Sequence, residues 1–229
     1  MSKAIRLWDL PTRLFHWLLV LAVIAAVVSG QLGGGLIDWH GRIGLFIIGL
    51  VVFRLVWGLI GSTYARFAQF FPTPAKIRAY LQGQWRQPGH NPLGALSVFG
   101  LLAVVGIQAV LGLFANDDIA FHGPLYDLVD KAMSNRLTGL HHLLANLLFL
   151  LVGLHLAAIA FYAIGKKDNL VRPMLTGKKT VENGEDARGG GPIALIVALL
   201  LAAAAVHAAS GAWLPPPPPP PPAAEVPSW

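Results

Sequence analysis

The sequence predicts an all-α integral membrane protein: a bundle of four transmembrane helices with a fifth transmembrane helix at its C-terminal end. Of the 229 residues, 55% are hydrophobic and only 12% are charged, whereas a soluble domain carries about 25% charged residues. The mean hydropathy is +0.60. The apolar residues form long runs, each near the ~20 residues that cross ~30 Å of hydrocarbon as a helix.

Five such runs predict the spans, at 14–32, 43–62, 94–115, 140–164 and 192–213. The first is not a cleavable signal peptide, because it is too long, lacks a small-residue cleavage site and contains His16. A polar, glycine-rich stretch before the fifth run predicts a flexible linker, and the prolines after it predict a polyproline rod. No segment shows a strand pattern. The expected organisation is a membrane domain at 1–180, a linker at 181–191, the fifth helix at 192–213 and a polyproline tail at 214–229.

The net charge is +6, and the basic residues lie beside the apolar runs. Their placement therefore indicates how the chain is oriented in the membrane and does not indicate a nucleic-acid-binding surface. The loop at 63–93 has four basic residues and no acidic one, and the segment after the fourth run is also basic. By contrast, the connection at 116–138 has four aspartates against two basic residues. The positive-inside rule places the N-terminus in the cytoplasm, and five spans then place the C-terminus outside.

Four of the histidines in or beside the predicted spans lie at matching depths in the membrane. An ionisable side chain in a membrane span is costly, so it tends to face the bundle interior and to have a partner. His16 and His155 lie toward the cytoplasmic face, and His40 and His141 toward the outer face. The histidines therefore fall in two layers, each with contributions from two helices.

Helical phase supports this pairing. His141 and His155 are 14 residues apart, which is about 40° short of four full turns and roughly 21 Å along the axis. They share one face of their helix, whereas His142 points about 100° away from His141. We therefore pair His155 with His16 and His141 with His40, and call them the inner pair and the outer pair.

Paired imidazoles across a helix bundle predict non-covalent haem b, one per layer, and hence a four-helix haem-binding bundle. The absence of cysteine excludes disulfides, iron–sulfur clusters, thiolate ligation and covalent haem attachment. Zinc is the competing metal, but structural zinc needs four ligands. A lone buried histidine could also be an ordinary interior residue. We expect the other histidines to be surface residues (His90, His122), a neighbour of the outer pair that could bond a haem propionate (His142) and an interior residue rather than a third-site ligand (His207).

Several motifs resemble the bacterial cytochrome b561 family, which shares a domain with the cytochrome b subunits of nickel–iron hydrogenases. The resemblance covers roughly residues 5–180. It implies two b-type haems, with ligands that fall on His16, His40, His141 and His155. The motifs are WDLPTRLFHW (8–17), HGRIGLFIIGLVVFR (40–54), GHNPLGAL (89–96), LHHLLANLLFLLVGLHLAA (140–158) and KKDNLVRPMLTGKK (166–179).

The family also has an arginine on its second helix, which corresponds to Arg54 here. A buried arginine needs an anion, for which a haem propionate or a bound quinone is the natural candidate. Snorkelling to the interface is the alternative. Gly44, one turn after His40, would let a porphyrin approach the backbone, or it could serve helix packing. The fifth span and the polyproline tail depart from the four-helix members.

These features predict transmembrane electron transfer by a two-haem b-type cytochrome. The resemblance implies a bacterial inner membrane, with a quinone on one side and a periplasmic cytochrome c or redox enzyme on the other. We expect an electron carrier and leave quinone-linked oxidoreductase activity and oligomeric state open. One alternative is the membrane-anchor subunit of a hydrogenase or another reductase complex. A proton-coupled transporter with histidine relays is disfavoured, because the spans hold essentially no acidic residue.

Overall fold

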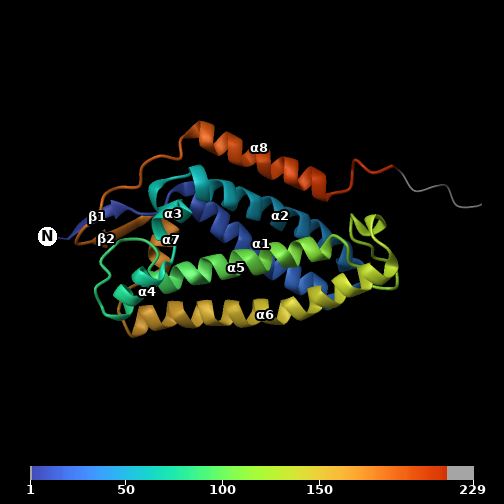
Figure 1. The fold of residues 1–229 in the computed structure, drawn as a ribbon, viewed down its shortest axis with the longest axis horizontal. Coiled ribbons are helices and arrows are strands. Elements are labelled where there is room, and N and C mark those ends of the chain that lie inside the picture. Colours follow the sequence, from blue (N-terminus) through green and yellow to red (C-terminus); the bar gives the residue numbers. More distant parts are fainter. Residues whose placement is uncertain (1, 216–229) are drawn as a thin grey trace, which may run out of the picture.

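Five long helices dominate the computed structural model, which describes residues 2–215 (Figure 1). Each is long and apolar enough to cross a membrane, which confirms the five spans predicted from the sequence. Except for Pro215, the predicted proline rod lies outside the described residues. The five helices are α1 (Leu10–Leu32), α2 (Ile37–Ile60), α5 (Pro92–Gly112), α6 (Lys131–Ile164) and α8 (Pro192–Ala209).

Polar caps start three of these helices. Asp9 accepts a hydrogen bond from the Thr12 amide at 2.7 Å, and Asp130 accepts one from the Met133 amide at 2.8 Å. Asn91 does the same at the start of α5, where Pro92 follows. Such caps satisfy amide groups that have no partner in the first turn. The cap at Asp130 lets α6 begin nine residues before the predicted span at 140–164, so α6 extends to roughly 50 Å.

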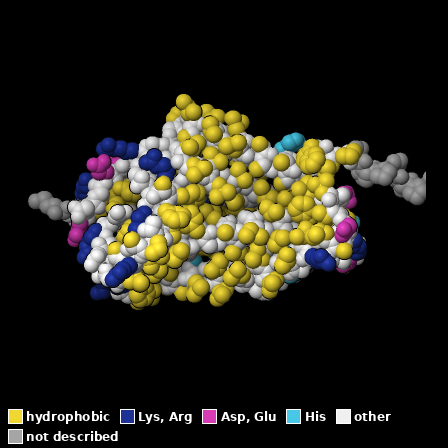
Figure 2. Space-filling model, viewed as in Figure 1, with side chains coloured by type: hydrophobic (Ala, Val, Ile, Leu, Met, Phe, Trp, Pro, Cys, Tyr) yellow, Lys and Arg dark blue, Asp and Glu magenta, His cyan; other side chains and the backbone are white. Residues whose placement is uncertain are grey.

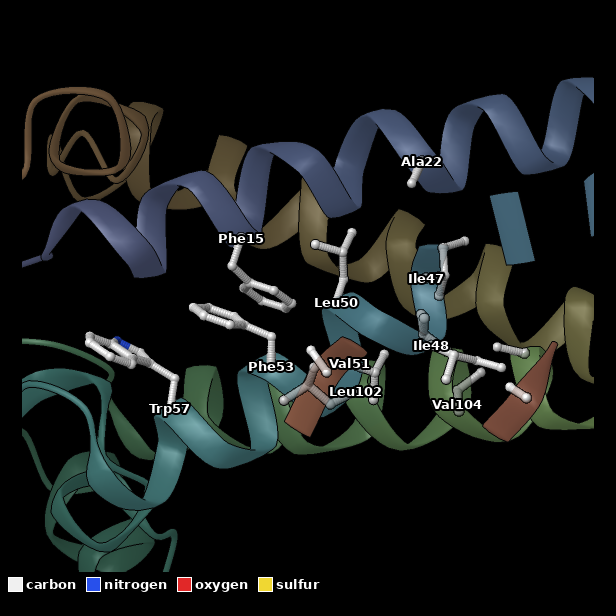
Figure 3. Packing of buried hydrophobic residues seen from close by; sticks show 14 of the residues in the cluster. Phe15, Ala22, Ile47, Ile48, Leu50, Val51, Phe53, Trp57, Leu102 and Val104 are labelled. Atoms are coloured by element: carbon white, nitrogen blue, oxygen red, sulfur yellow. The ribbon is translucent and has the colours of Figure 1, made fainter. Parts of the chain in front are cut away.

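Helix α2 lies at the centre of the bundle and packs against α1, α5 and α8, while α6 packs against α5. Figure 1 shows α8 and α6 on opposite sides, with the other three helices between them. The buried core comes from the facing sides of α1, α2 and α5 (Figure 3), where Phe15, Phe53 and Trp57 lie toward one end. In the described chain α1 and α6 are not packed closely against each other.

Small residues bring α8 onto α2. Ala198, Ala202 and Ala209 are buried in this contact, and a Cβ atom built on Gly49 would lie 2.9 Å from Cγ2 of Val206. Residues 182–190, inside the segment predicted as a linker, are hydrogen-bonded to the rest of the chain. Their partners are the Arg6 backbone, Thr63 and the Tyr64 hydroxyl.

A two-stranded antiparallel sheet closes one end of the bundle, which we call the strand end. Strand β1 (Lys3–Arg6) pairs with β2 (Lys178–Val181), so the prediction that no strand is present was wrong. Both strands are four residues long and strongly basic, which leaves too few positions for an apolar alternation to show. Figure 2 shows Lys and Arg gathered chiefly at the strand end and apolar side chains over the middle.

The remaining elements are short and lie in the connections between the long helices. The segment at 113–130 joins α5 to α6 at the other end of the bundle, which we call the loop end. The short elements are the 3-10 turns η1 (Gly34–Leu36), η2 (Thr63–Ala65) and η3 (Tyr126–Leu128) and the helices α3 (Phe67–Phe70), α4 (Pro74–Leu81) and α7 (Val171–Thr176).

Candidate haem-binding sites

The outer pair meets at the loop end. The ring centroids of His40, on α2, and His141, on α6, are 5.9 Å apart, and the ring planes are inclined by 83°. Two metal–imidazole bonds of about 2 Å each, with the ring radii added, give a centroid separation of about 6 Å. The two rings are therefore close enough for both to bind one metal ion.

Both imidazoles of the outer pair are held by the backbone of a third or fourth helix. Nδ1 of His40 lies 2.8 Å from the Ala26 carbonyl oxygen on α1, and Nδ1 of His141 lies 2.9 Å from the Gln108 carbonyl oxygen on α5. A carbonyl oxygen can only accept, so each Nδ1 carries the proton and donates it. Nε2 of each ring keeps its lone pair, which is the arrangement that metal-bound histidines adopt.

Two glycines make room for these rings. A Cβ atom built on Gly30 would lie 2.9 Å from Nδ1 of His40, and one built on Gly112 would lie 3.2 Å from Cε1 of His141. Sequence reasoning did not single out Gly30 or Gly112, although a glycine inside an apolar helix is a signal of close approach. A Cβ atom on Gly44 would meet nothing within 4 Å, so the helix faces open space there.

The inner pair lies toward the strand end. His16 on α1 and His155 on α6 are close enough for their charges to interact. Nδ1 of His155 faces the Ser97 hydroxyl on α5 at 3.5 Å, a longer contact than those of the outer pair. Helices α1 and α6 are not packed closely against each other, so the inner pair lies on two helices that are separated within the described chain.

Arg54 is buried beside the inner pair, with 3% of its surface exposed. Its guanidinium lies over the Phe67 ring at 4.6 Å, and its NH1 group has no hydrogen-bond partner within the described chain. The nearby acid is Asp9, whose two oxygens already accept from the Thr12 amide and from Nε1 of Trp57. The snorkelling alternative does not describe this side chain, which ends inside the protein and not at its surface.

His90 belongs to the same region and is partly buried there, whereas the sequence predicted an ordinary surface residue. Its ring lies between Trp8 and Phe70, at centroid distances of 4.7 and 4.6 Å, and its Nδ1 is buried without a hydrogen-bond partner in the described part of the chain. Burial lowers the pKa of His90 to about 3, and the charges of Arg54, His16 and His155 act in the same direction. The imidazole is therefore neutral at ordinary pH. The aromatic neighbours come from distant segments, so the local sequence gave no sign of this burial.

The other three histidines are exposed. His122 stacks on Tyr126 at 4.0 Å in the loop between α5 and α6, as expected of a surface residue. His142 neighbours His141 at 6.2 Å between ring centroids but faces outward from α6. His207 is exposed on α8, so the expectation of interior packing was wrong; α8 contacts α2 through its alanines.

The arrangement offers pairs of ligands and not clusters. Within residues 2–215, no three His, Asp or Glu side chains gather as a metal site. The outer pair instead offers two imidazoles 5.9 Å apart, and the region of the inner pair holds buried nitrogen atoms without partners in the described chain. These are features that fit a flat, dianionic cofactor with two axial positions.

Comparisons with known proteins agree with this chemistry. The family described as prokaryotic cytochrome b561 matches residues 7–177. A probable Ni/Fe-hydrogenase 1 B-type cytochrome subunit of Escherichia coli (strain K12) is 25% identical, over 41% of this chain and 52% of the relative. A probable Ni/Fe-hydrogenase B-type cytochrome subunit of Azotobacter vinelandii is 26% identical, over 43% and 53%. The chain spans about half the length of these curated relatives. No solved structure matches it.

Proposed function

The chain belongs to the prokaryotic cytochrome b561 family, and from this premise we propose that it transfers electrons across a bacterial membrane through two non-covalent b-type haems. The family is one of multi-pass membrane cytochromes, and the five apolar helices agree with it. When bound, each haem supplies the one-electron chemistry, while the protein supplies ligands, orientation and an apolar surrounding.

The observation that carries this proposal is the pair of Nδ1 hydrogen bonds in the outer pair. They fix the tautomer of His40 and His141 so that both Nε2 lone pairs are free to bind iron. The carbonyl groups come from α1 and α5, so all four helices of the bundle hold this one site. A histidine that served only packing would not need both its ring nitrogens arranged in this way.

His16 and His155 would hold the second haem on the strand-end side, with Ser97 as the neighbour of the His155 ring. Arg54 lies beside them and supplies a positive charge without a hydrogen-bonded anion. A cation near a haem favours the reduced, more electron-rich form, so Arg54 would raise the potential of this haem. The roughly 21 Å between the ligand layers would be shortened by the porphyrins, which gives a path for electrons between the two faces.

For partners, we propose the membrane quinone pool and a periplasmic cytochrome c or redox enzyme. The basic strand end supports a cytoplasmic position for the N-terminus, and the C-terminus would then be periplasmic (Figure 2). A second proposal is favoured by the names of the relatives: the chain would be the membrane cytochrome subunit of a hydrogenase or another reductase complex.

A reduced-minus-oxidised visible spectrum of the purified chain, with extraction of the haem as its pyridine complex, tests the central proposal. We expect two haems b per chain with low-spin iron. A preparation that takes up no haem, or only one, would contradict the two-haem arrangement. Purification from the native membrane separates the two partner proposals, because a stable hydrogenase or reductase subunit would copurify in stoichiometric amount only in the second case.

A further inference from the structure

We propose that His90, together with Arg54, binds a carboxylate of a propionate on the inner-pair haem. The inference rests on the proposed function, since it concerns the haem held by His16 and His155. It assigns a role to a residue that the sequence alone marked as part of the surface. In this role His90 is a positioning residue for the cofactor and not an iron ligand.

The first argument is the coincidence of two buried nitrogen atoms without partners in one region, a permanent donor on Arg54 and, on His90, an Nδ1 that carries the proton in one of the two neutral tautomers. Arg54 NH1 and His90 Nδ1 are both buried and both lack a hydrogen-bond partner in the described chain. Arg54 is close enough for its charge to act on the His90 imidazole. A buried polar group without a partner costs about 1–3 kcal/mol, and more if it is charged, so two such groups together indicate a missing acceptor.

The second argument concerns which acceptor would satisfy both groups. A guanidinium is permanently charged and matches a carboxylate or a phosphate. The protein's own nearby carboxylate, Asp9, is already engaged by Thr12 and Trp57. A neutral quinone carbonyl would leave the charge of Arg54 uncompensated. The pair of donors therefore favours an anion, and a haem brings two carboxylates to this depth.

The third argument is that the donors are held in place before the ligand arrives. Trp8 and Phe70 contact the His90 ring from β1–α1 and from α3, and Phe67 lies against the Arg54 guanidinium. The Phe70 ring also packs against Phe99 on α5, at 5.8 Å between centroids. This aromatic surrounding keeps water away, which strengthens a charge-assisted hydrogen bond.

The test compares His90→Leu, which removes the donor, with His90→Gln, which can restore one. The matched control is His122→Leu, because His122 is exposed and at the loop end. Haem content is measured first, and then the rate at which each haem transfers to excess apomyoglobin. The inner-pair haem is identified as the component that His155→Ala lacks.

We expect His90→Leu to retain two haems and to lose the inner-pair haem on the order of tenfold faster, as the loss of a hydrogen bond to a charged group implies. His90→Gln should recover part of the difference, and His122→Leu should match the wild type. Equal acceleration of both haems, or no acceleration, would overturn the assignment. If His90→Leu fails to accumulate, His90→Phe takes its place, because it keeps an aromatic ring between Trp8 and Phe70 but cannot donate a hydrogen bond.

Reconstitution with haem dimethyl ester distinguishes a propionate from a free anion, such as a lipid phosphate. The wild-type chain should hold esterified haem at the inner pair on the order of tenfold more weakly than haem b, and His90→Leu should reduce this preference. An unchanged preference in the variant would overturn the proposal. A chain in which His16→Ala and His155→Ala keep both haems would instead contradict the proposed function, whatever His90 does.

Discussion

His40 and His141 face each other at 5.9 Å although 100 residues separate them in the chain. Each donates its Nδ1 proton to a carbonyl of another helix, Ala26 on α1 and Gln108 on α5. A hydrogen bond at Nδ1 both orients a ring and makes its Nε2 a better ligand. The outer pair is therefore preorganised by the same backbone that builds the bundle.

Removal of either imidazole of this pair should prevent the binding of the same haem. We expect His40→Ala and His141→Ala each to leave one haem b per chain, because iron with one axial ligand is held weakly in the bundle. Haem extraction and the low-spin signal in electron paramagnetic resonance measure this. The control is His142→Ala, since His142 adjoins His141 but is exposed. If His142→Ala loses a haem and His141→Ala keeps both, then His142 and not His141 is the ligand.

Depth in the predicted spans paired these histidines, and helical periodicity supported the pairing, because the 3.6-residue repeat places residues 14 apart on one face wherever a helix stays straight. The neighbours that hold the rings were not accessible in the same way. Ala26 and Gln108 act through backbone carbonyls, which every residue has, so no residue type marks them. His90 was missed because its burial depends on Trp8 and Phe70, which only the tertiary fold brings together.

We expect Gly112 to be needed for the normal binding of the outer haem. A methyl group at this position would stand 3.2 Å from Cε1 of His141, so Gly112→Ala should tilt the ring or push α5 away from α6. Overpacking of this kind costs about 1–3 kcal/mol, and we expect a weakened or high-spin outer haem in the visible spectrum. The matched control is Gly100→Ala on the same helix, where a Cβ atom meets nothing within 4 Å. Identical spectra for the two variants would contradict the steric argument.

We expect Arg54 to raise the reduction potential of the inner-pair haem. Its buried charge stabilises an electron on the nearby haem, so Arg54→Leu should lower the potential of the inner-pair haem. The change should be tens of millivolts, the scale of one charge acting through an effective dielectric constant of about 20. Arg54→Lys keeps the charge and should keep most of the potential. An optical redox titration that gives the wild-type potentials in Arg54→Leu would contradict this role of the Arg54 charge.

The loop between α5 and α6 should loosen at low pH. Hydrogen bonds from the backbone amides of Ile119, Phe121 and Ala120 hold the pKa of Asp117 below its usual value. A lowered folded-state pKa contributes stability above the ordinary carboxyl pKa of about 3.9, and this stability is lost as the pH falls through the folded value. Phe121 packs near Gly41, one residue from His40.

Amide hydrogen exchange at 119–121 measures this effect. We expect Asp117→Ala to exchange faster than the wild type at pH 7, and the two proteins to converge under acid conditions, where the wild-type carboxyl also lacks its charge. Asp127→Ala is a suitable control, because Asp127 lies in the same loop but no side-chain hydrogen bond from it is seen in the structure at 2–215. A difference between Asp117→Ala and the wild type that persists after the pH has fallen through the lowered pKa of Asp117 would rule out the titration as its cause.

The five spans could be predicted because the composition and length of a segment identify a membrane helix without knowledge of the fold. The exact helix boundaries and the β1–β2 sheet could not be predicted, since they depend on pairings between segments that are far apart in the sequence. Lys3 pairs with Val181 in the sheet, and the Arg6 amide donates to Asp186. The glycine-rich composition at 181–191 is typical of a linker, yet its polar backbone groups find partners in segments more than 100 residues away.

The fifth helix should be dispensable for haem binding, because all four proposed ligands precede it. Among the long helices of the described chain, α8 packs chiefly against α2, and its buried residues are Ala198, Ala202 and Ala209. A chain that ends after Gly191 keeps the hydrogen bonds of residues 182–190 and should retain both haems. One that ends after Lys179 loses them and part of β2, so it should retain both haems but unfold at a lower temperature.

Haem content and thermal unfolding of the two truncated chains separate the contribution of α8 from that of the segment before it. Gly49→Leu should resemble the chain that ends after Gly191, because the leucine side chain would displace Val206 from α2 without removing any residue. Loss of the outer haem in Gly49→Leu and in the chain ending after Gly191 would mean that α8 is needed to hold α2, and with it His40, against α1. Retention of both haems in all three proteins, with unchanged spectra, would leave α8 free to serve contact with another membrane protein.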